Sequence, residues 1–300
     1  MRNKFSLPAL ACAALLLLQA RPNFNPGPYY APEKNVTIQG VNLVYLDQGT
    51  GTPVLLIHGF CGNAYNWSEV FEPLSKDFRV IVPDLPGYGK SGCPGKDQKP
   101  TMIWYADFLA EFLDQIGVGK AIVVGNSMGG SIAAWLAVRH PEKVEKLVLE
   151  DSAGLKGSLL DLMKNVAQLT ASPMLIPLLH LVFPVNEKAL ANVPESERRR
   201  VELAEMRYAS DQRLCSSRAM KQSAVSLGAD YTEPVLNQIQ APCLIIWGSD
   251  DDLLDPETAE QFHQKIPGSQ IQIIAGGVHT PMQWKPDEFV RVLKKFITEK

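Results

Sequence analysis

The chain has 300 residues, of which 46% are apolar and 20% charged, and its formal net charge is −3. This composition is ordinary for a globular protein with one large core, or with a core and an insertion. The charge balance shows no basic excess, so a nucleic-acid-binding protein is not expected. No repeat of fixed period and no low-complexity tract is visible in the sequence.

The N-terminus predicts a targeting segment. Two early positive charges precede an apolar stretch from Phe5 to Leu18, which contains Pro8. This stretch is short for a membrane span and fits the apolar region of a secretory signal peptide. We expect residues 1–20 to be a signal peptide or a membrane anchor, and the protein to be exported or membrane-associated. The Pro-, Gly- and Asn-rich residues 21–35 predict a linker.

From residue 36 onward, predicted strands alternate with predicted helices. An alternating segment with a central glycine indicates a hairpin over residues 36–49. The strands that follow are continuous apolar runs, as expected for a parallel sheet covered on both faces. The helix over 101–117 is amphipathic, with large apolar residues at steps of four. The other predicted elements of this part are strands at 53–60, 78–92, 120–127 and 144–151, and a helix at 128–143.

The alternation breaks between residues 153 and 231, where helix-like segments are separated by prolines. It then resumes with strands at 241–248 and 269–277 and helices at 256–266 and 286–297. We therefore expect an α/β core of residues 36–152 and 232–300, interrupted by a helical cap at 153–231. Two independent α/β domains are less favoured, because each piece alone has too few strands to close a sheet.

Five cysteines occur without the spacing of a zinc site. Loss of Cys12 with a signal peptide leaves four, which allow three pairings that the sequence does not distinguish. Cys243 lies in an apolar run and is expected to be a small core residue. No metal and no cofactor is expected. Besides Cys12 and Cys243, the chain contains the cysteines Cys61, Cys93 and Cys215.

The stretch Gly-Asn-Ser-Met-Gly-Gly raises the question of chemistry, because Ser127 sits between a predicted strand and a predicted helix. A serine in a turn often makes only a local hydrogen bond. The spacing Gly125-x-Ser127-x-Gly129, however, matches a nucleophile elbow, in which small flanking residues allow a sharp, strained turn. The serine would then stand at a helix N-terminus, which favours developing negative charge.

A neutral serine needs a base and a group that orients the base. His279 follows the last predicted strand and is the expected base, whereas His263 lies within a predicted helix and is expected at the surface. Asp251, which follows the strand at 241–248, is the expected acid. Asp252 remains a competing acid. Alternatives for the aspartates at 250–252 are a solvated helix start or a calcium loop. Asp255 is expected to cap the next helix.

Acyl transfer also requires donors for the oxyanion. The backbone N–H groups of Phe60 and Met128 are the expected donors, because one follows an apolar strand and the other follows the serine. His58 is expected to hold a loop rather than to take part in catalysis.

At this point the chain resembles the α/β-hydrolase fold family. The matching segments, in family order, are HGF, DLPGYGKS, GNSMGG, WGSDD and VHTP, at 58–60, 84–91, 125–130, 247–251 and 278–281. The resemblance implies an eight-stranded, mostly parallel sheet with a cap between strands six and seven. Ser127 argues against dehalogenases and epoxide hydrolases, which carry Asp at that position. Val278 and Trp284 depart from the family pattern, in which Gly and Glu are usual.

The resemblance implies a serine hydrolase that cleaves carboxylic esters through an acyl-enzyme on Ser127, His279 and Asp251. The expected partner is a small ester with an apolar acyl or aromatic group, since the predicted cap is apolar. Carbon–carbon hydrolases of aromatic ring-cleavage products, and cofactor-free perhydrolases or haloperoxidases, are alternatives with the same triad. A binding protein that kept the fold without hydrolysis is an alternative of another class.

Overall fold

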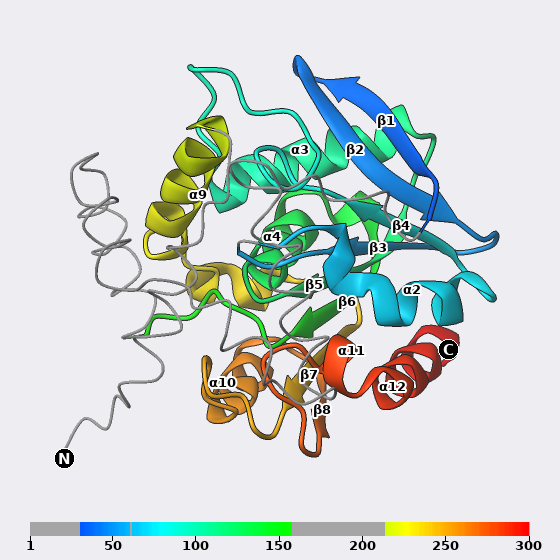
Figure 1. The fold of residues 1–300 in the computed structure, drawn as a ribbon. Helices are drawn as coiled ribbons and strands as arrows, with labels where there is room; N and C mark the ends of the chain where they lie inside the picture. Colours follow the sequence, from blue (N-terminus) through cyan, green and yellow to red (C-terminus); the bar gives the residue numbers. More distant parts are fainter. Residues whose placement is uncertain (1–30, 61, 158–213, 300) are drawn as a thin grey trace, which may run out of the picture.

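The computed structural model describes residues 31–60, 62–157 and 214–299. These residues form a sheet of eight strands (Figure 1). The strands are β1 (Glu33–Ile38), β2 (Val41–Gln48), β3 (Pro53–Ile57), β4 (Arg79–Pro83), β5 (Ala121–Asn126), β6 (Val144–Glu150), β7 (Cys243–Gly248) and β8 (Gln270–Ile274).

The strand order is β1-β2-β4-β3-β5-β6-β7-β8. β2 pairs antiparallel with both β1 and β4, and the pairings from β4 through to β8 are parallel. The expected eight-stranded, mostly parallel sheet is therefore confirmed. The predicted hairpin is β1–β2, whose turn passes through Gly40 at φ +79°. β1 begins at Glu33, inside the range 21–35 that the sequence predicts as a linker.

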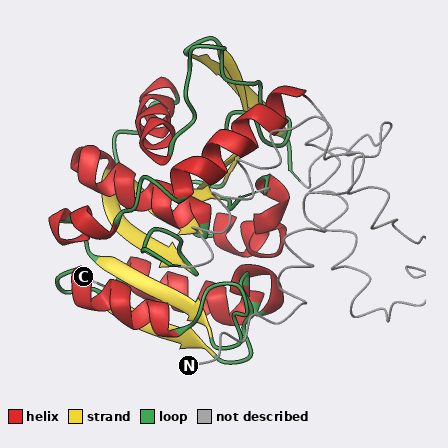
Figure 2. Ribbon diagram, turned by 90° about the vertical axis from the view of Figure 1, so that its left-hand side faces the viewer, coloured by secondary structure: helices red, strands yellow, loops and turns green. Residues whose placement is uncertain are grey.

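Helices cover both faces of the sheet, as Figures 1 and 2 show. They belong to the connections between strands, as in other α/β sheets. The α-helices are α2 (Ser68–Ser75), α3 (Met102–Gln115), α4 (Met128–Arg139), α9 (Leu214–Leu227), α10 (Glu257–Lys265), α11 (Pro281–Trp284) and α12 (Pro286–Thr298). Short 3-10 helices are η1 (Ala64–Trp67), η2 (Pro141–Lys143) and η3 (Glu233–Gln238).

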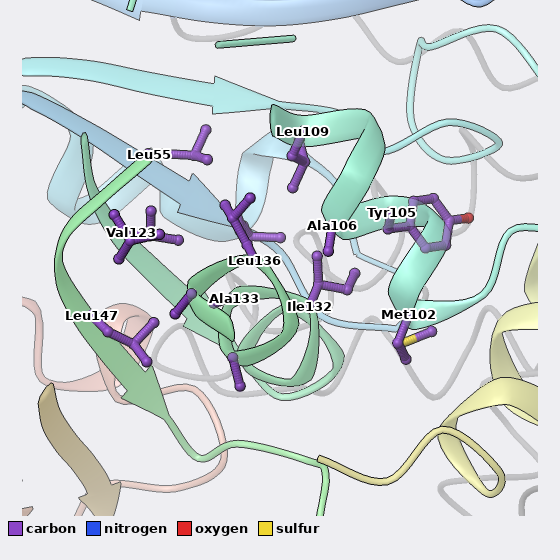
Figure 3. Packing of buried hydrophobic residues seen from close by; sticks show 14 of the residues in the cluster. Leu55, Met102, Tyr105, Ala106, Leu109, Val123, Ile132, Ala133, Leu136 and Leu147 are labelled. Atoms are coloured by element: carbon purple, nitrogen blue, oxygen red, sulfur yellow. The ribbon is translucent and has the colours of Figure 1, made fainter. Parts of the chain in front are cut away.

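Alternate residues of the central strands enter two separate cores, because successive side chains of a strand point to opposite faces. Leu55 and Val123 pack with α3 and α4 (Figure 3). Leu56 and Val124 pack in the opposite core with α2 and α12. Each such fully buried side chain contributes about 1.5–3 kcal/mol of transfer free energy. Burial on both faces explains why these strands have continuous apolar sequences.

Local sequence explains the helices that cover the sheet. The Thr101 hydroxyl accepts the Trp104 N–H at 3.1 Å and caps α3, which ends before Gly117 at φ +70°. α12 is amphipathic, and its buried residues Phe289, Leu293 and Phe296 recur at helical spacing. These helices pack against the sheet and stabilise it, and the sheet in turn positions the loops at its edges.

The predicted insertion falls between β6 and β7. Within its range the structure describes 153–157 and 214–231, which contain α9 and no strand. The rest of the predicted cap, 158–213, lies outside the described residues, so the domain boundaries remain predictions.

The predicted targeting segment, 1–20, also lies outside the described residues. In the described part of the chain, no helix has both the length and the apolar character needed to cross a membrane. Cys93 is disulfide-bonded, whereas Cys243 is a free, buried thiol in β7.

Candidate active site

The predicted site residues gather at one edge of the sheet, because the carboxyl ends of parallel strands share an edge. Phe60 follows β3, Ser127 follows β5, Asp251 follows β7 and His279 follows β8. Met128 is the first residue of α4. Residues that are remote from one another in the chain therefore meet through the topology of the sheet.

Ser127 lies on a strained turn between β5 and α4. Its φ of +54° and ψ of −117° are in a region that non-glycine residues rarely adopt. Its N–H donates to the Glu150 carbonyl at 3.0 Å, and its own carbonyl accepts from the Ala153 N–H at 3.0 Å. These bonds to β6 and to the segment after it hold the turn in place. The observed strain is what a nucleophile elbow requires.

Glycines make this turn sterically feasible. A Cβ on Gly125 would lie 2.2 Å from the Gly129 carbonyl oxygen, and a Cβ on Gly129 would lie 2.2 Å from the Ile57 carbonyl oxygen. A Cβ on Gly130 would lie 2.2 Å from the Ser152 hydroxyl oxygen. The strand, the turn and the helix therefore approach one another at backbone distance, and larger residues have no room.

The loop after β3 lies against the serine. A Cβ on Gly59 would lie 3.2 Å from the Ser127 Cβ, so the backbone next to Phe60 borders the turn. Met128 occupies the first turn of α4, where backbone N–H groups have no partner within the helix. The two expected oxyanion donors therefore belong to segments that adjoin Ser127.

His58 bridges two loops near this turn. Its Nε2 accepts the Leu85 N–H at 3.0 Å, which leaves Nδ1 to donate to the Gly59 carbonyl at 2.8 Å. The side chain is fully buried, and both ring nitrogens are occupied. This geometry is that of a loop-holding residue, which is the role that its place in the sequence predicts.

His279 and Asp251 form a hydrogen-bonded pair. His279 Nδ1 lies 2.8 Å from Asp251 Oδ2, and the other oxygen, Oδ1, accepts the N–H groups of Leu253 and Leu254 at 2.8 and 3.0 Å. Burial alone would raise the pKa of Asp251, but the hydrogen bond and charge of His279 outweigh it and hold that pKa below its usual value. Asp251 is thus an ionised, oriented partner for the imidazole.

The competing residues of this region have other surroundings. Asp252 is exposed, and Asp250 accepts the Ser249 hydroxyl at 2.6 Å. Among the described residues, the carboxyl oxygens of these three aspartates do not gather around one point, as the ligands of a calcium ion would. His263 belongs to α10, and its ring pairs with the Ser269 hydroxyl at 2.9 Å rather than with an aspartate. Asp255 accepts the Glu257 N–H at 2.9 Å at the start of α10.

Two contacts join the histidine loop to β5 and β6. The Asn126 side-chain amide donates to the His279 carbonyl at 3.1 Å, so the residue before Ser127 is bonded to the backbone of His279. The Glu150 carboxyl accepts the Met282 N–H at 3.1 Å, just beyond the histidine. The structure therefore joins His279 directly to Asp251, and to the strand of Ser127 through Asn126.

Sequence reasoning missed Glu150 and Asp151, two buried acids at the end of β6. Burial raises the pKa of Glu150 to about 8, and the Met282 N–H only partly opposes this shift. Burial, followed by the neighbouring acids Glu150 and Asp251, raises the pKa of Asp151 well above its usual value. Two consecutive acids directly after the apolar residues 147–149 were the available signal for them in the sequence.

A strained serine after a parallel strand, with an Asp–His pair at the same sheet edge, defines a class of α/β enzyme in which chemistry occurs at strand ends. Comparison with known proteins places the chain more closely. The sequence model of the alpha/beta hydrolase fold family matches residues 52–286. The chain belongs to the α/β-hydrolase fold family, and the expected family, fold and hydrolase class are confirmed.

Individual relatives differ in the reactions that their names describe. The chain is 31% identical over 276 residues to 2-hydroxy-6-oxo-6-(2'-aminophenyl)hexa-2,4-dienoic acid hydrolase of Metapseudomonas resinovorans, covering 89% of this chain and 91% of the relative. It is 29% identical over 269 residues to lipase 1 of Psychrobacter immobilis, covering 88% and 83%. A solved structure of a bacterial membrane phospholipase A has a TM-score of 0.71 at 27% identity, covering 97% of this chain and 90% of that chain.

Proposed function

We propose that the protein is a serine hydrolase that cleaves carboxylic esters through an acyl-enzyme. The observation that carries the proposal is the strained Ser127 at the sheet edge where Asp251 and His279 are hydrogen-bonded. A lipase and a phospholipase among the similar proteins support an ester as the substrate.

In this mechanism His279 takes the proton of the Ser127 hydroxyl as the oxygen attacks the ester carbonyl. Asp251 keeps the imidazole in one orientation and stabilises its positive charge. The N–H groups of Phe60 and Met128 hold the oxyanion. The alcohol leaves with the proton from His279, and water then releases the acid from Ser127 by the same steps.

A second candidate is hydrolysis of a carbon–carbon bond in a ring-cleavage product. The 31% identity to a hydrolase of a substituted hexadienoic acid favours this reaction over perhydrolysis or halide oxidation. The same three side chains would serve both ester and carbon–carbon hydrolysis, so the triad does not separate them. The substrate distinguishes the two reactions, because the dienoic acid contains no ester bond and can be cleaved only at a carbon–carbon bond.

We also propose that the protein is exported and that its substrate has an apolar acyl or aromatic group. The signal-like N-terminus supports export, and so does the disulfide at Cys93, because disulfides persist in oxidising compartments. The similarity to a membrane phospholipase is consistent with association with a membrane. Mass measurement of the mature N-terminus after expression in a secreting host tests the targeting prediction.

The central experiment combines a fluorophosphonate probe with p-nitrophenyl esters of increasing chain length. Wild type should be labelled and should turn over esters, and Ser127→Ala should lose both. Ser131→Ala is the matched control, because Ser131 lies four residues further on, is buried, and its hydroxyl has no hydrogen-bond partner among the described residues. Labelling without ester turnover, combined with cleavage of the dienoic acid, would favour the second candidate. Absence of labelling in a folded protein would contradict a serine nucleophile.

A further inference from the structure

Asp151 carries a carboxyl oxygen for which the described part of the chain provides no donor. The side chain is fully buried. Its Oδ1 accepts the Gly248 N–H at 3.0 Å, but its Oδ2 has no hydrogen-bond partner among the described residues. A carboxylate in this position would leave a buried charged oxygen unsatisfied, which is costly. The backbone of Asp151 is also in the left-handed region, at φ +40°, so the residue is held at some conformational cost.

The carboxyl of Asp151 also lies close to the acid and the base of the candidate triad. Oxygen atoms of Asp151 and Asp251 and a ring nitrogen of His279 lie within 4.8 Å of one another. Two buried carboxylates so close to each other oppose double ionisation, and one of them keeps a proton. Asp251 already accepts three N–H donors, whereas Asp151 accepts one. N–H donors favour the charged form of a carboxyl group, so Asp251 is the ionised acid and Asp151 carries the proton.

We propose that Asp151 is a positioning residue of the triad, a neutral carboxylic acid whose Oδ2–H donates a hydrogen bond to the Asp251 carboxylate. His279 is then supported by two carboxyl groups that share one negative charge. The additional hydrogen bond fixes the orientation of Asp251 and lowers its basicity, so that it stabilises the imidazolium without taking its proton. The inference rests on the proposed function only for its catalytic consequence, because the hydrogen bond itself follows from the buried geometry.

A metal ion is a poorer account of the same three side chains. His279 Nδ1 lies 2.8 Å from Asp251 Oδ2, which is the length of an N–H···O hydrogen bond. A metal at Nδ1 would need the lone pair of that nitrogen and would break the pair. A proton satisfies the unpartnered oxygen and leaves the Asp–His bond intact.

The proposal predicts an alkaline loss of activity. Among the described residues, the ionisable groups near Asp151 are Glu150 at the end of β6, Asp251 in the loop after β7 and His279 in the loop after β8. When Asp151 loses its proton at high pH, its charge opposes Asp251 and the hydrogen bond between them is lost. The pKa of Glu150, about 8, also lies in the alkaline range, so Glu150→Gln must serve as the background or control.

Asp151→Asn is the decisive variant. Its amide can accept the Gly248 N–H and donate to Asp251, as the neutral acid does, but has no proton to lose. We expect kcat/KM within about 3-fold of wild type near neutral pH, and an alkaline decline that is shifted upward or absent. Asp151→Ala removes the donor, and kcat should fall about 10- to 100-fold with little change in KM, the range for a hydrogen bond to a charged group.

A spectroscopic readout makes the test independent of turnover. In the Glu150→Gln background, the infrared carbonyl band of a buried protonated carboxyl should be present at neutral pH and should disappear when Asp151→Asn is added. Absence of that band in the background would overturn the proposal. A loss in Asp151→Asn as large as in Asp151→Ala would also overturn it, because Asp151 would then act as an anion. If Ser127→Ala remained active while the band behaved as expected, the proposed function would fail and the hydrogen bond would stand.

Discussion

The end of β5 and the ends of β6 and β7 lie at the same edge of the sheet, yet the two regions are held by different forces. At the end of β5, Ser127 is placed by backbone strain and by close contacts between glycines and carbonyl groups. At the ends of β6 and β7, the acids Glu150, Asp151 and Asp251 are placed by hydrogen bonds and by their charge states. The first region is therefore sensitive to the volume of the side chains around Ser127. The second region is sensitive to the protonation states of its acids.

The largest expected effect is on catalysis, at the acid of the proposed triad. Asp251→Asn should lower kcat/KM for an ester by about 10³-fold or more, because an amide cannot stabilise the imidazolium. Asp252→Asn should change it by less than about 3-fold, since Asp252 is exposed. Steady-state kinetics of the two variants would settle the choice between the acids. A larger loss in Asp252→Asn would reverse the assignment.

The volume-sensitive region should fail by loss of stability. Gly125→Ala places a Cβ against backbone, and the free energy of unfolding should fall by about 3 kcal/mol or more. Gly119→Ala is the matched control, because no atom of the described residues lies within 4 Å of the added Cβ. It should be neutral or stabilising by about 0.5 kcal/mol. Denaturant unfolding checks both values, and equal stabilities would disprove the steric account of the elbow.

The protonation-sensitive region should show a dependence on pH. The folded-state pKa of Glu150 is raised to about 8 from 4.5, so the folded state binds more protons between these values and stability falls as pH rises through them. Glu150→Gln removes this slope, and its stability relative to wild type should increase by on the order of a few kcal/mol from pH 5 to pH 9. Glu145→Gln is the control, because Glu145 is exposed on the same strand, and its stability relative to wild type should not change between these pH values. Thermal unfolding at both pH values distinguishes the two.

The smallest effect is expected at an acid that has cationic partners. Asp47 accepts two hydrogen bonds from Arg79, at 3.0 Å each, and one from Lys34 at 2.8 Å. Burial would raise the pKa of Asp47, but these partners lower it overall. Its stabilisation is therefore present above the unfolded pKa and is lost as pH falls through the folded one. Asp47→Asn should cost about 1 kcal/mol at pH 7, as both cations are partly solvated, and nothing in strong acid. Denaturant unfolding at the two pH values checks this difference.

Sequence patterns anticipated the regular part of this fold well. The hairpin, the parallel strands and the helices α3, α4, α10 and α12 follow from apolar runs, helical periodicity and glycine positions, all of which are local. The helices α2, α9 and α11 were not predicted from the sequence. The candidate residues Ser127, Asp251 and His279 came from motifs at predicted strand ends, and the structure places them at one sheet edge. Their roles remain predictions, because geometry alone does not measure reactivity.

The acids after β6 could not be recognised in the same way. Glu150 is the last residue of β6 and Asp151 follows it, and acidic side chains are seldom fully buried. In the folded protein both acids are buried, Glu150 accepts the N–H of Met282 in α11, and Asp151 lies beside Asp251 and His279. A local sequence pattern does not predict contacts between segments that are so far apart in the chain.

By itself, the sequence determined the order of strands and helices, the family and the side chains available for chemistry. These depend on residue type and spacing, which the chain carries directly. The tertiary structure decided which aspartate bonds to His279, and it gave Glu150 and Asp151 their raised pKa values. Burial and distance between remote segments set both outcomes, and these quantities exist only once the sheet has assembled.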